Sequence, residues 1–340
     1  RFGVRTGGDR RLIGRLEDED TLPLAPTRRF AGARDDQAGP IVEQPMHFGD
    51  RGGSRLFGVL SRPARGDRRQ TGVVLVNSGA VSRVGPNGLY VALAREWASL
   101  GYTVLRMDVG GLGDSEVPSG ALENHTYPDH AVSDVAAGVA ALRAQGLKRV
   151  VVAGLCSGAH ASFHAGLELD GVNGLLIINP IVFYWKSSDP LDVSAWVNYS
   201  ELRHYKGSVL RADSWLRLLP GKVNVFYVAQ VGVTRLREIA RAELASLGRR
   251  LRGQRDESDD AARDLERMAA KGTDLLLLFS AGDPGLDFLT LNYSRELRKL
   301  RRLPGFRLQV IDDADHTFTA LEARRRAGTV LTEHLLARHP

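Results

Sequence analysis

The stretch over residues 149–161 reads Arg149-Val150-Val151-Val152-Ala153-Gly154-Leu155-Cys156-Ser157-Gly158-Ala159-His160-Ala161. The β-branched run at its start is typical of a strand buried on both faces, and the run after Gly158 predicts a helix. Small residues two positions before and after Cys156 permit a sharp turn between the two elements, because neighbouring backbones meet there. The turn also brings Cys156 to a helix N-terminus, where the dipole and free N–H groups favour a thiolate. This pattern predicts a reactive thiol at Cys156.

Strands and helices alternate on both sides of this stretch. The predicted strands cover residues 45–48, 55–60, 72–76, 102–107, 149–153, 175–179, 274–280 and 306–311. The predicted helices cover residues 89–100, 130–144, 157–167, 288–300 and 320–337. The first two strands predict an antiparallel opening, and the regular alternation after them predicts an α/β fold with a mostly parallel sheet and helices on both faces.

Two regions interrupt or precede this pattern. Residues 1–40 are rich in Arg, Asp, Gly and Pro and predict a tail or linker. Residues 181–271 pass from aromatic to mixed-charge sequence and predict a helical lid inserted into a core of residues 41–180 and 272–340. The mixed charges of that insertion are typical of a solvated helix face.

Composition excludes several classes of protein. The 340 residues are 43% hydrophobic and 25% charged, which is ordinary for a globular protein. One cysteine excludes a disulfide scaffold and a thiolate zinc site. The net charge of +6 arises from 40 Arg and 6 Lys against 40 acidic residues, and a basic balance alone does not indicate nucleic-acid binding.

The sequence also predicts where the protein is located in the cell. Its apolar runs are shorter than the roughly 20 residues that cross a bilayer, so we expect no membrane span and a cytoplasmic protein. The first residue is Arg1 rather than Met, and we expect the chain to be a piece that is fused to or follows another biosynthetic domain.

The turn at Cys156 and two later loops resemble the α/β-hydrolase superfamily over roughly residues 42–340, with cysteine in the place usual for serine. In that family the acid and base follow the nucleophile on loops after later strands. Asp283 lies in Ala281-Gly282-Asp283-Pro284-Gly285 and His316 in Asp312-Asp313-Ala314-Asp315-His316-Thr317-Phe318. The resemblance implies a triad of Cys156, Asp283 and His316. Asp287 is the alternative acid, and Ser157 is the alternative nucleophile.

The resemblance also implies the remaining parts of the site. An oxyanion hole is expected at the backbone N–H groups of Ser157 and Ala80. The loop over residues 108–115 is expected to be structural, and His160 is expected to pack on the helix after Cys156. Tyr127 is a candidate for the entrance of the site.

A cysteine at this position predicts acyl transfer, because an acyl-cysteine remains an activated thioester. Related enzymes with a cysteine here include dienelactone hydrolases, polyhydroxyalkanoate synthases and Dieckmann cyclases, and the scaffold alone does not choose among them. The prediction is release or transfer of an acyl chain from a carrier-protein or CoA thioester. The alternatives are an ester or lactone hydrolase of the dienelactone-hydrolase type and a catalytically silent interaction module. No cofactor, metal or nucleic-acid partner is expected.

Overall fold

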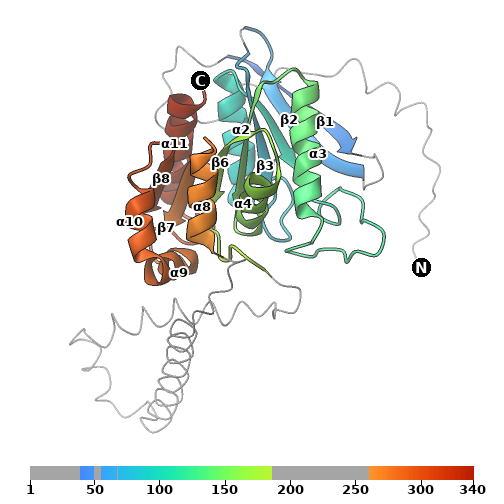
Figure 1. The fold of residues 1–340 in the computed structure, drawn as a ribbon. Coiled ribbons are helices and arrows are strands. Elements are labelled where there is room, and N and C mark those ends of the chain that lie inside the picture. Colours follow the sequence, from blue (N-terminus) through green and yellow to red (C-terminus); the bar gives the residue numbers. More distant parts are fainter. Residues whose placement is uncertain (1–38, 50–54, 67, 186–259) are drawn as a thin grey trace, which may run out of the picture.

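The computed structural model describes residues 39–49, 55–66, 68–185 and 260–340 (Figure 1). The predicted tail over residues 1–40 is described only at residues 39–40. The predicted lid over residues 181–271 is described only at its two ends, residues 181–185 and 260–271, and both regions stay predictions. In the part of the chain that is described, none of the helices combines the length and apolar character that crossing a membrane requires.

Eight strands in the described residues form one sheet, in the order β1-β2-β4-β3-β5-β6-β7-β8. The strands are β1 (Ile41–Gly49), β2 (Arg55–Pro63), β3 (Thr71–Val76), β4 (Thr103–Met107), β5 (Arg149–Leu155), β6 (Val172–Ile178), β7 (Asp274–Ser280) and β8 (Phe306–Ile311). The pairs β1–β2 and β2–β4 are antiparallel, and all other neighbouring pairs are parallel. The predicted antiparallel opening and mostly parallel sheet are confirmed.

Helices cover both faces of this sheet (Figure 1). They are η2 (Pro86–Gly88), α2 (Leu89–Ser99), α3 (Ala131–Ala144), α4 (Ser157–Glu168), α8 (Ala261–Ala270), α9 (Pro284–Asn292), α10 (Ser294–Leu300) and α11 (Leu321–Arg338). Apolar side chains of α3, α4, α8, α9 and α10 belong to one buried cluster, and those of α2 and α11 belong to another on the opposite face. The sheet is therefore the middle layer of three.

The central strand β3 explains why these strands are uninterrupted apolar runs. Val74 and Val76 lie in the first cluster, whereas Val73 and Leu75 lie in the second. All four side chains are at most 1% exposed. Successive residues of a strand point to opposite faces, so a strand covered on both faces needs an apolar residue at every position.

The region predicted as one helix over residues 288–300 forms two helices instead. The chain leaves helical geometry at Tyr293, where φ is −131°, and this separates α9 from α10. Helix α9 also begins earlier than predicted, at Pro284, because the Asp283 side chain caps it by accepting a hydrogen bond from the N–H of Gly285. Proline suits the first turn of a helix, since its missing N–H would have no partner there.

Helix α8 lies within the range predicted for the insertion, yet it packs on the sheet. Its residues Ala261, Ala262, Leu265 and Met268 are buried in the apolar cluster that α4 also joins. The exposed residues Arg263, Glu266 and Arg267 occupy its other face, as expected for an amphipathic helix at a surface. This helix thus contributes to the core that holds β6 and β7.

Candidate active site

The three predicted triad residues follow the carboxyl ends of parallel strands. Cys156 comes directly after β5, Asp283 comes three residues after β7, and His316 lies in the loop that follows β8. Parallel strands end at the same edge of a sheet, so their following loops meet there. The topology therefore brings residues from three distant parts of the sequence to one edge.

The backbone at Cys156 adopts a sharp and uncommon conformation. Its φ is 58° and its ψ is −115°, a combination that non-glycine residues rarely adopt. A Cβ atom on Gly154 would lie 2.2 Å from the carbonyl of Gly158, and a Cβ atom on Gly158 would lie 2.5 Å from the carbonyl oxygen of Val76. Both glycines are therefore required by close backbone contacts. The turn presents the side chain of Cys156, which is half-buried, at the end of β5.

The hydroxyl of Ser157 has a structural partner. Its Oγ accepts a hydrogen bond of 2.7 Å from the N–H of Gly79, in the loop that follows β3. Ser157 is only 6% exposed. The contact places the loop carrying Ala80 against the start of α4, where the first N–H groups of a helix lack intrahelical acceptors.

Asp283 and His316 form a direct hydrogen-bonded pair. Asp283 Oδ2 lies 2.6 Å from His316 Nδ1, and Asp283 Oδ1 accepts a hydrogen bond of 2.9 Å from the N–H of Gly285. The Asp283 side chain is fully buried. Asp287, the alternative acid, lies one turn further along α9. Asp283 is thus bonded to the imidazole.

The imidazole of His316 favours its protonated form. Burial lowers the pKa of His316, but hydrogen bonding to Asp283 and to the Cys156 side chain, together with their charges, raises it to about 10. Among the described residues, the buried Nε2 atom of His316 has no hydrogen-bond partner of standard geometry. Since Nδ1 is bonded to Asp283, Nε2 is the ring nitrogen that is left for the Cys156 side chain.

An asparagine that the sequence reasoning missed supports the histidine loop. The Nδ2 group of Asn179 donates to the carbonyl of His316 at 2.7 Å and to Ser280 Oγ at 2.9 Å. Ser280 Oγ in turn donates to the carbonyl of Asp315 at 2.7 Å. Asn179 is fully buried and follows the carboxyl end of β6, and this position was the available signal.

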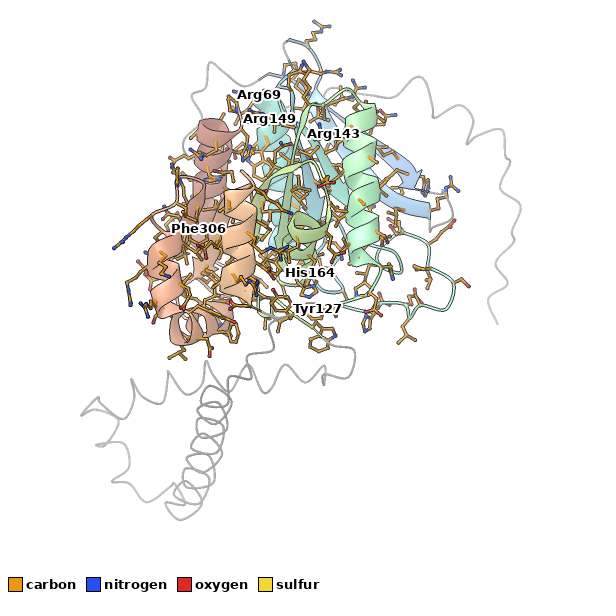
Figure 2. The ribbon with its side chains drawn as sticks, in the orientation of Figure 1. Arg69, Tyr127, Arg143, Arg149, His164 and Phe306 are labelled. Carbon is orange, nitrogen blue, oxygen red and sulfur yellow. The ribbon has the colours of Figure 1, made fainter. Side chains whose placement is uncertain are left out.

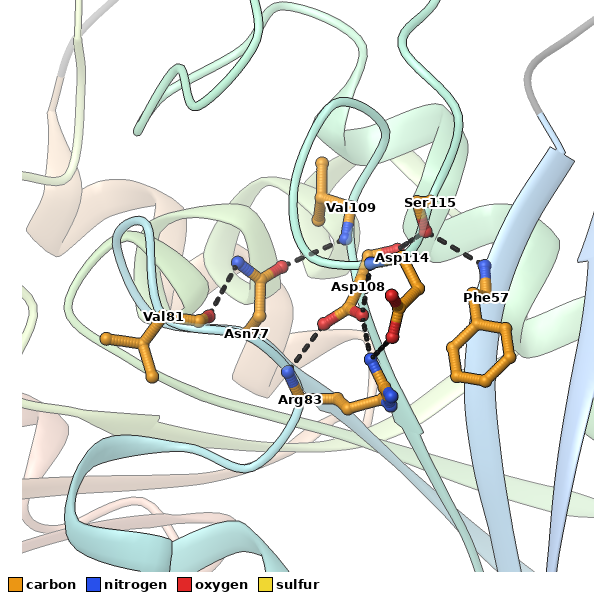
Figure 3. Close-up of polar contacts among 8 residues, drawn as sticks. All are labelled: Phe57, Asn77, Val81, Arg83, Asp108, Val109, Asp114 and Ser115. Carbon is orange, nitrogen blue, oxygen red and sulfur yellow. Dashed lines mark hydrogen bonds and ion pairs between the residues drawn. The ribbon is translucent and has the colours of Figure 1, made fainter. Parts of the chain in front are cut away.

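A second polar network holds the loop after β3 (Figure 3). The backbone N–H and the Nη1 of Arg83 bind the two carboxylate oxygens of Asp108 at 2.5 and 2.6 Å, and Nη1 also contacts Asp114 at 2.6 Å. Asn77 Oδ1 accepts from the N–H of Val109 at 3.0 Å. These contacts tie the loops after β3 and β4 together, in agreement with the structural role predicted for residues 108–115.

Aromatic and imidazole rings gather at the same edge of the sheet. Figure 2 shows Tyr127 and His164 at the end of the molecule opposite Arg149, the first residue of β5. Tyr127 stacks on Trp185 with ring centroids 4.9 Å apart, and it meets His160 edge-on at 5.2 Å. Burial, with a smaller effect from His164, lowers the pKa of His160 to about 3. His160 is thus a neutral ring that packs beside the site, as predicted.

One group of His and acidic side chains in the described residues is close enough together to hold a metal ion. It consists of Asp274, His334 and His339, whose ligand atoms lie within 4.8 Å of one another. The Asp274 carboxylate already binds His334 at 2.6 Å and Arg338 at 2.7 Å. The group lies at the amino end of β7, at the opposite end of that strand from the Asp283 loop, and is separate from the candidate active site.

Comparison with known proteins extends these observations to a family. The family model described as the alpha/beta hydrolase family matches residues 73–328. The chain belongs to the alpha/beta hydrolase family. This family member carries cysteine at the turn after β5, and the sequence-based prediction of an α/β-hydrolase fold is confirmed.

Solved structures with the same fold share little sequence with this family member. Esterase PF2001 of Pyrococcus furiosus has a TM-score of 0.53 and 15% identity, over 95% of this chain and 99% of the esterase. The dienelactone hydrolase-like promiscuous phosphotriesterase P91, from metagenomic libraries, has a TM-score of 0.52 and 15% identity, over 89% and 100%. The alpha/beta hydrolase GrgF from Penicillium sp. sh18 has a TM-score of 0.50 and 16% identity, over 87% and 98%. No curated protein sequence matches.

Proposed function

We propose that this protein hydrolyses carboxylic esters or lactones through an acyl-cysteine intermediate at Cys156. The observation that carries the proposal is the joint placement of Cys156 on a strained turn and of the His316–Asp283 pair beside it. A nucleophile, a base and a group that orients the base are the three parts that covalent acyl chemistry requires.

The first half of the reaction forms the acyl-cysteine. The Cys156 thiolate attacks the substrate carbonyl carbon, and the carbonyl oxygen takes up the electron pair as an oxyanion. The N–H groups of Ser157 and Ala80 would donate hydrogen bonds to that oxyanion. When the C–O bond to the leaving group breaks, the His316 imidazolium transfers its proton to the departing alkoxide, so an alcohol leaves and a neutral imidazole remains.

The second half releases the acid and restores the site. His316 takes a proton from a water molecule, whose oxygen attacks the carbonyl carbon of the acyl-cysteine. Collapse of the second oxyanion breaks the C–S bond, and the sulfur leaves as a thiolate beside the newly formed imidazolium. Throughout both halves, Asp283 holds the imidazole by its hydrogen bond to Nδ1 and balances the charge of the imidazolium.

Two comparisons support ester or lactone substrates over the carrier-bound thioesters favoured by the sequence reasoning. PF2001 is an esterase and P91 is dienelactone hydrolase-like, and both share the fold of this chain. The cysteine favours a second candidate, acyl transfer from a carrier-protein or CoA thioester, because a thioester intermediate is readily attacked by acceptors other than water. The acceptor in the second half of the reaction separates these two functions.

The test is intact-protein mass spectrometry after exposure to a panel of aryl esters, lactones, acyl-pantetheines and acyl-CoAs. An adduct of acyl mass is expected on the wild type and on Ser157→Ala, and none is expected on Cys156→Ala. A water chase should release the free acid from ester-derived adducts, whereas release only by amines, alcohols or carrier thiols would favour the transferase.

Two results would refute the proposal. Turnover of esters by Cys156→Ala at the wild-type rate would remove the sulfur from the mechanism. The absence of adduct and turnover across the whole panel would instead support a non-enzymatic interaction module.

A further inference from the structure

The loop that carries His316 is held by side chains from three other parts of the chain. This histidine loop, residues 312–320, connects β8 to α11. Three of its successive backbone carbonyls each accept a hydrogen bond from a side chain that lies far away in the sequence. Ser280 Oγ donates to Asp315 at 2.7 Å, Asn179 Nδ2 donates to His316 at 2.7 Å, and Asn87 Nδ2 donates to Thr317 at 3.1 Å. The loop is therefore fixed at the histidine itself and on both sides of it.

Two of these donors, Asn179 and Ser280, form a buried pair. Asn179 has no exposed surface and Ser280 is 1% exposed. The N–H of Ser280 donates to Asn179 Oδ1 at 2.7 Å, and Asn179 Nδ2 donates to Ser280 Oγ at 2.9 Å. A backbone N–H can only donate and a carbonyl can only accept, so these partners leave one orientation for the amide. The NH₂ group of Asn179 must therefore face the carbonyl of His316.

The backbone of the histidine loop is strained, so it needs such contacts. The φ angle is 50° at Asp313 and 52° at Phe318, in the left-handed region that residues other than glycine rarely adopt. Strained conformations persist where the surrounding structure determines them, and they cluster at active sites. The side-chain donors from outside the loop supply part of that support.

The contact at the carbonyl of His316 bears on the geometry of the imidazole. Nδ1 of the ring lies 2.6 Å from Asp283 Oδ2, and Nε2 is the nitrogen left for the Cys156 side chain. Both directions depend on the place from which the ring leaves the backbone, and Asn179 holds the backbone of that same residue. A displacement of about 1 Å in a catalytic group can reduce the rate roughly 100-fold.

We propose that Asn179 and Ser280 are positioning residues that hold the imidazole of His316 against its two partners in the triad. This inference rests on the proposed ester hydrolysis and adds two residues to it. Neither side chain exchanges a proton with the reacting atoms, because both act through the backbone of the histidine loop.

The experiment compares Asn179→Gly with the matched control Asn87→Gly. The two asparagines have positive φ angles of 43° and 55°, which glycine adopts without strain, so each change removes an amide and keeps the backbone conformation. Each amide donates to a carbonyl of the histidine loop, and the two carbonyls are adjacent. Asn87 is exposed, so water can replace its amide at Thr317, whereas Asn179 is buried.

The first readout is the pKa of His316, measured by NMR titration of the histidine ring signals in the folded protein, with His316→Gln to assign the signal. We expect this pKa to fall from about 10 toward its ordinary value of 6.5 in Asn179→Gly, by about 1 or more, because the ring moves away from the Asp283 carboxylate. Asn87→Gly should keep the wild-type value. A role of Asn179 in stability alone would lower the melting temperature and leave the pKa unchanged, and that result would overturn the proposal.

A second variant covers the case in which Asn179→Gly does not fold. Ser280→Ala removes one oxygen atom, which accepts from Asn179 and donates to Asp315. We expect the pKa of His316 to fall in this variant too, by a smaller amount. If Asn179→Gly does not fold, an unchanged pKa in Ser280→Ala would overturn the proposal.

Ester turnover provides the second readout. In Asn179→Gly, kcat per folded molecule should fall roughly 10-fold to 100-fold with little change in KM, because the chemical step depends on the imidazole. Asn87→Gly should lose much less, and a wild-type kcat in folded Asn179→Gly would also count against the positioning role. The NMR titration uses no substrate. An unchanged pKa therefore leaves the ester-hydrolase proposal standing, whereas ester turnover by Cys156→Ala at the wild-type rate refutes that proposal separately.

Discussion

Replacing Asp283 by asparagine should lower the pKa of His316 and remove most of the activity. Asparagine has nearly the same shape, and its side-chain oxygen can still accept from the N–H of Gly285, as Asp283 Oδ1 does at 2.9 Å. Its NH₂ group would then face His316 Nδ1, where the carboxylate oxygen now lies at 2.6 Å. A donor there favours the tautomer that carries its proton on Nε2, which cannot accept the thiol proton.

The size of the effect follows from the environment of the imidazole. A pKa of about 10 for His316 means that imidazolium outnumbers the neutral ring by roughly 1,000 to one at pH 7. Asp283 raises this pKa both by its hydrogen bond and by its charge, and the Cys156 side chain supplies the other increases. We expect Asp283→Asn to lower the pKa of His316 by about 2, and to reduce ester turnover by roughly 10²-fold to 10⁴-fold.

The same pair links stability to pH. The folded-state pKa of His316 is raised above its ordinary value of 6.5, so the stabilisation that comes with its proton is complete below about pH 6.5. That contribution is lost as the pH rises through about 10. The free energy of unfolding should therefore fall over this interval in the wild type, and it should fall less in Asp283→Asn.

The assay is a pH titration of the histidine ring signals by NMR, run beside ester turnover, with Asp287→Asn as the matched control. Asp287 is a carboxylate on the first turn of α9, close in sequence to Asp283. The control should lose much less turnover than Asp283→Asn, because it leaves the hydrogen bond of 2.6 Å between Asp283 and His316 in place. An unchanged pKa of His316 in Asp283→Asn, or a greater loss of turnover in Asp287→Asn, would refute this reasoning.

Two further predictions concern stability. Burial raises the pKa of Asp274, but its contacts with His334, His339 and Arg338 hold that pKa far below its usual value. The stabilising contribution of Asp274 is therefore present above about pH 3.9 and is lost in stronger acid. Asp274→Asn should therefore cost about 2–3 kcal/mol in urea unfolding at pH 7, with a gap from the wild type that narrows below about pH 4. In Gly158→Ala, the new Cβ would lie 2.5 Å from the carbonyl oxygen of Val76, and we expect a loss of about 2–3 kcal/mol. In the control Gly305→Ala, the new Cβ would lie 3.5 Å from the carbonyl oxygen of Thr273, an ordinary contact, and stability should change by less than about 1 kcal/mol. Equal losses of stability in the two glycine variants would show that the close contact at residue 158 is relieved.

Much of the fold was predictable because its signals are local. The continuous apolar run of β5 and the glycines around Cys156 each follow from a requirement of the nearby backbone, and the structure places all of them as predicted. The break between α9 and α10 at Tyr293 was not predicted. Its neighbours form a continuous helical pattern, and only the packing of two short helices against different neighbours separates them.

The candidate site was predictable in its parts but not in its contacts. The order along the chain indicated Asp283 and His316, and it left Asp287 and Ser157 as alternatives. The hydrogen bond from Asp283 to His316, and the one that Ser157 Oγ accepts from Gly79, were not predictable from the order of residues. They depend on how loops from different strands meet.

The sequence by itself determined the three-layer α/β fold, the strained turn at Cys156 and the order of the residues around it, because each depends on neighbours a few positions away. The tertiary structure alone decided that Asp283 is bonded to His316 and that Asn179 supports the histidine loop. Those contacts join residues separated by 33 and 137 positions. Hydrogen bonds of this kind depend on tenths of an ångström, and only the packing of helices against the sheet positions the loops that closely.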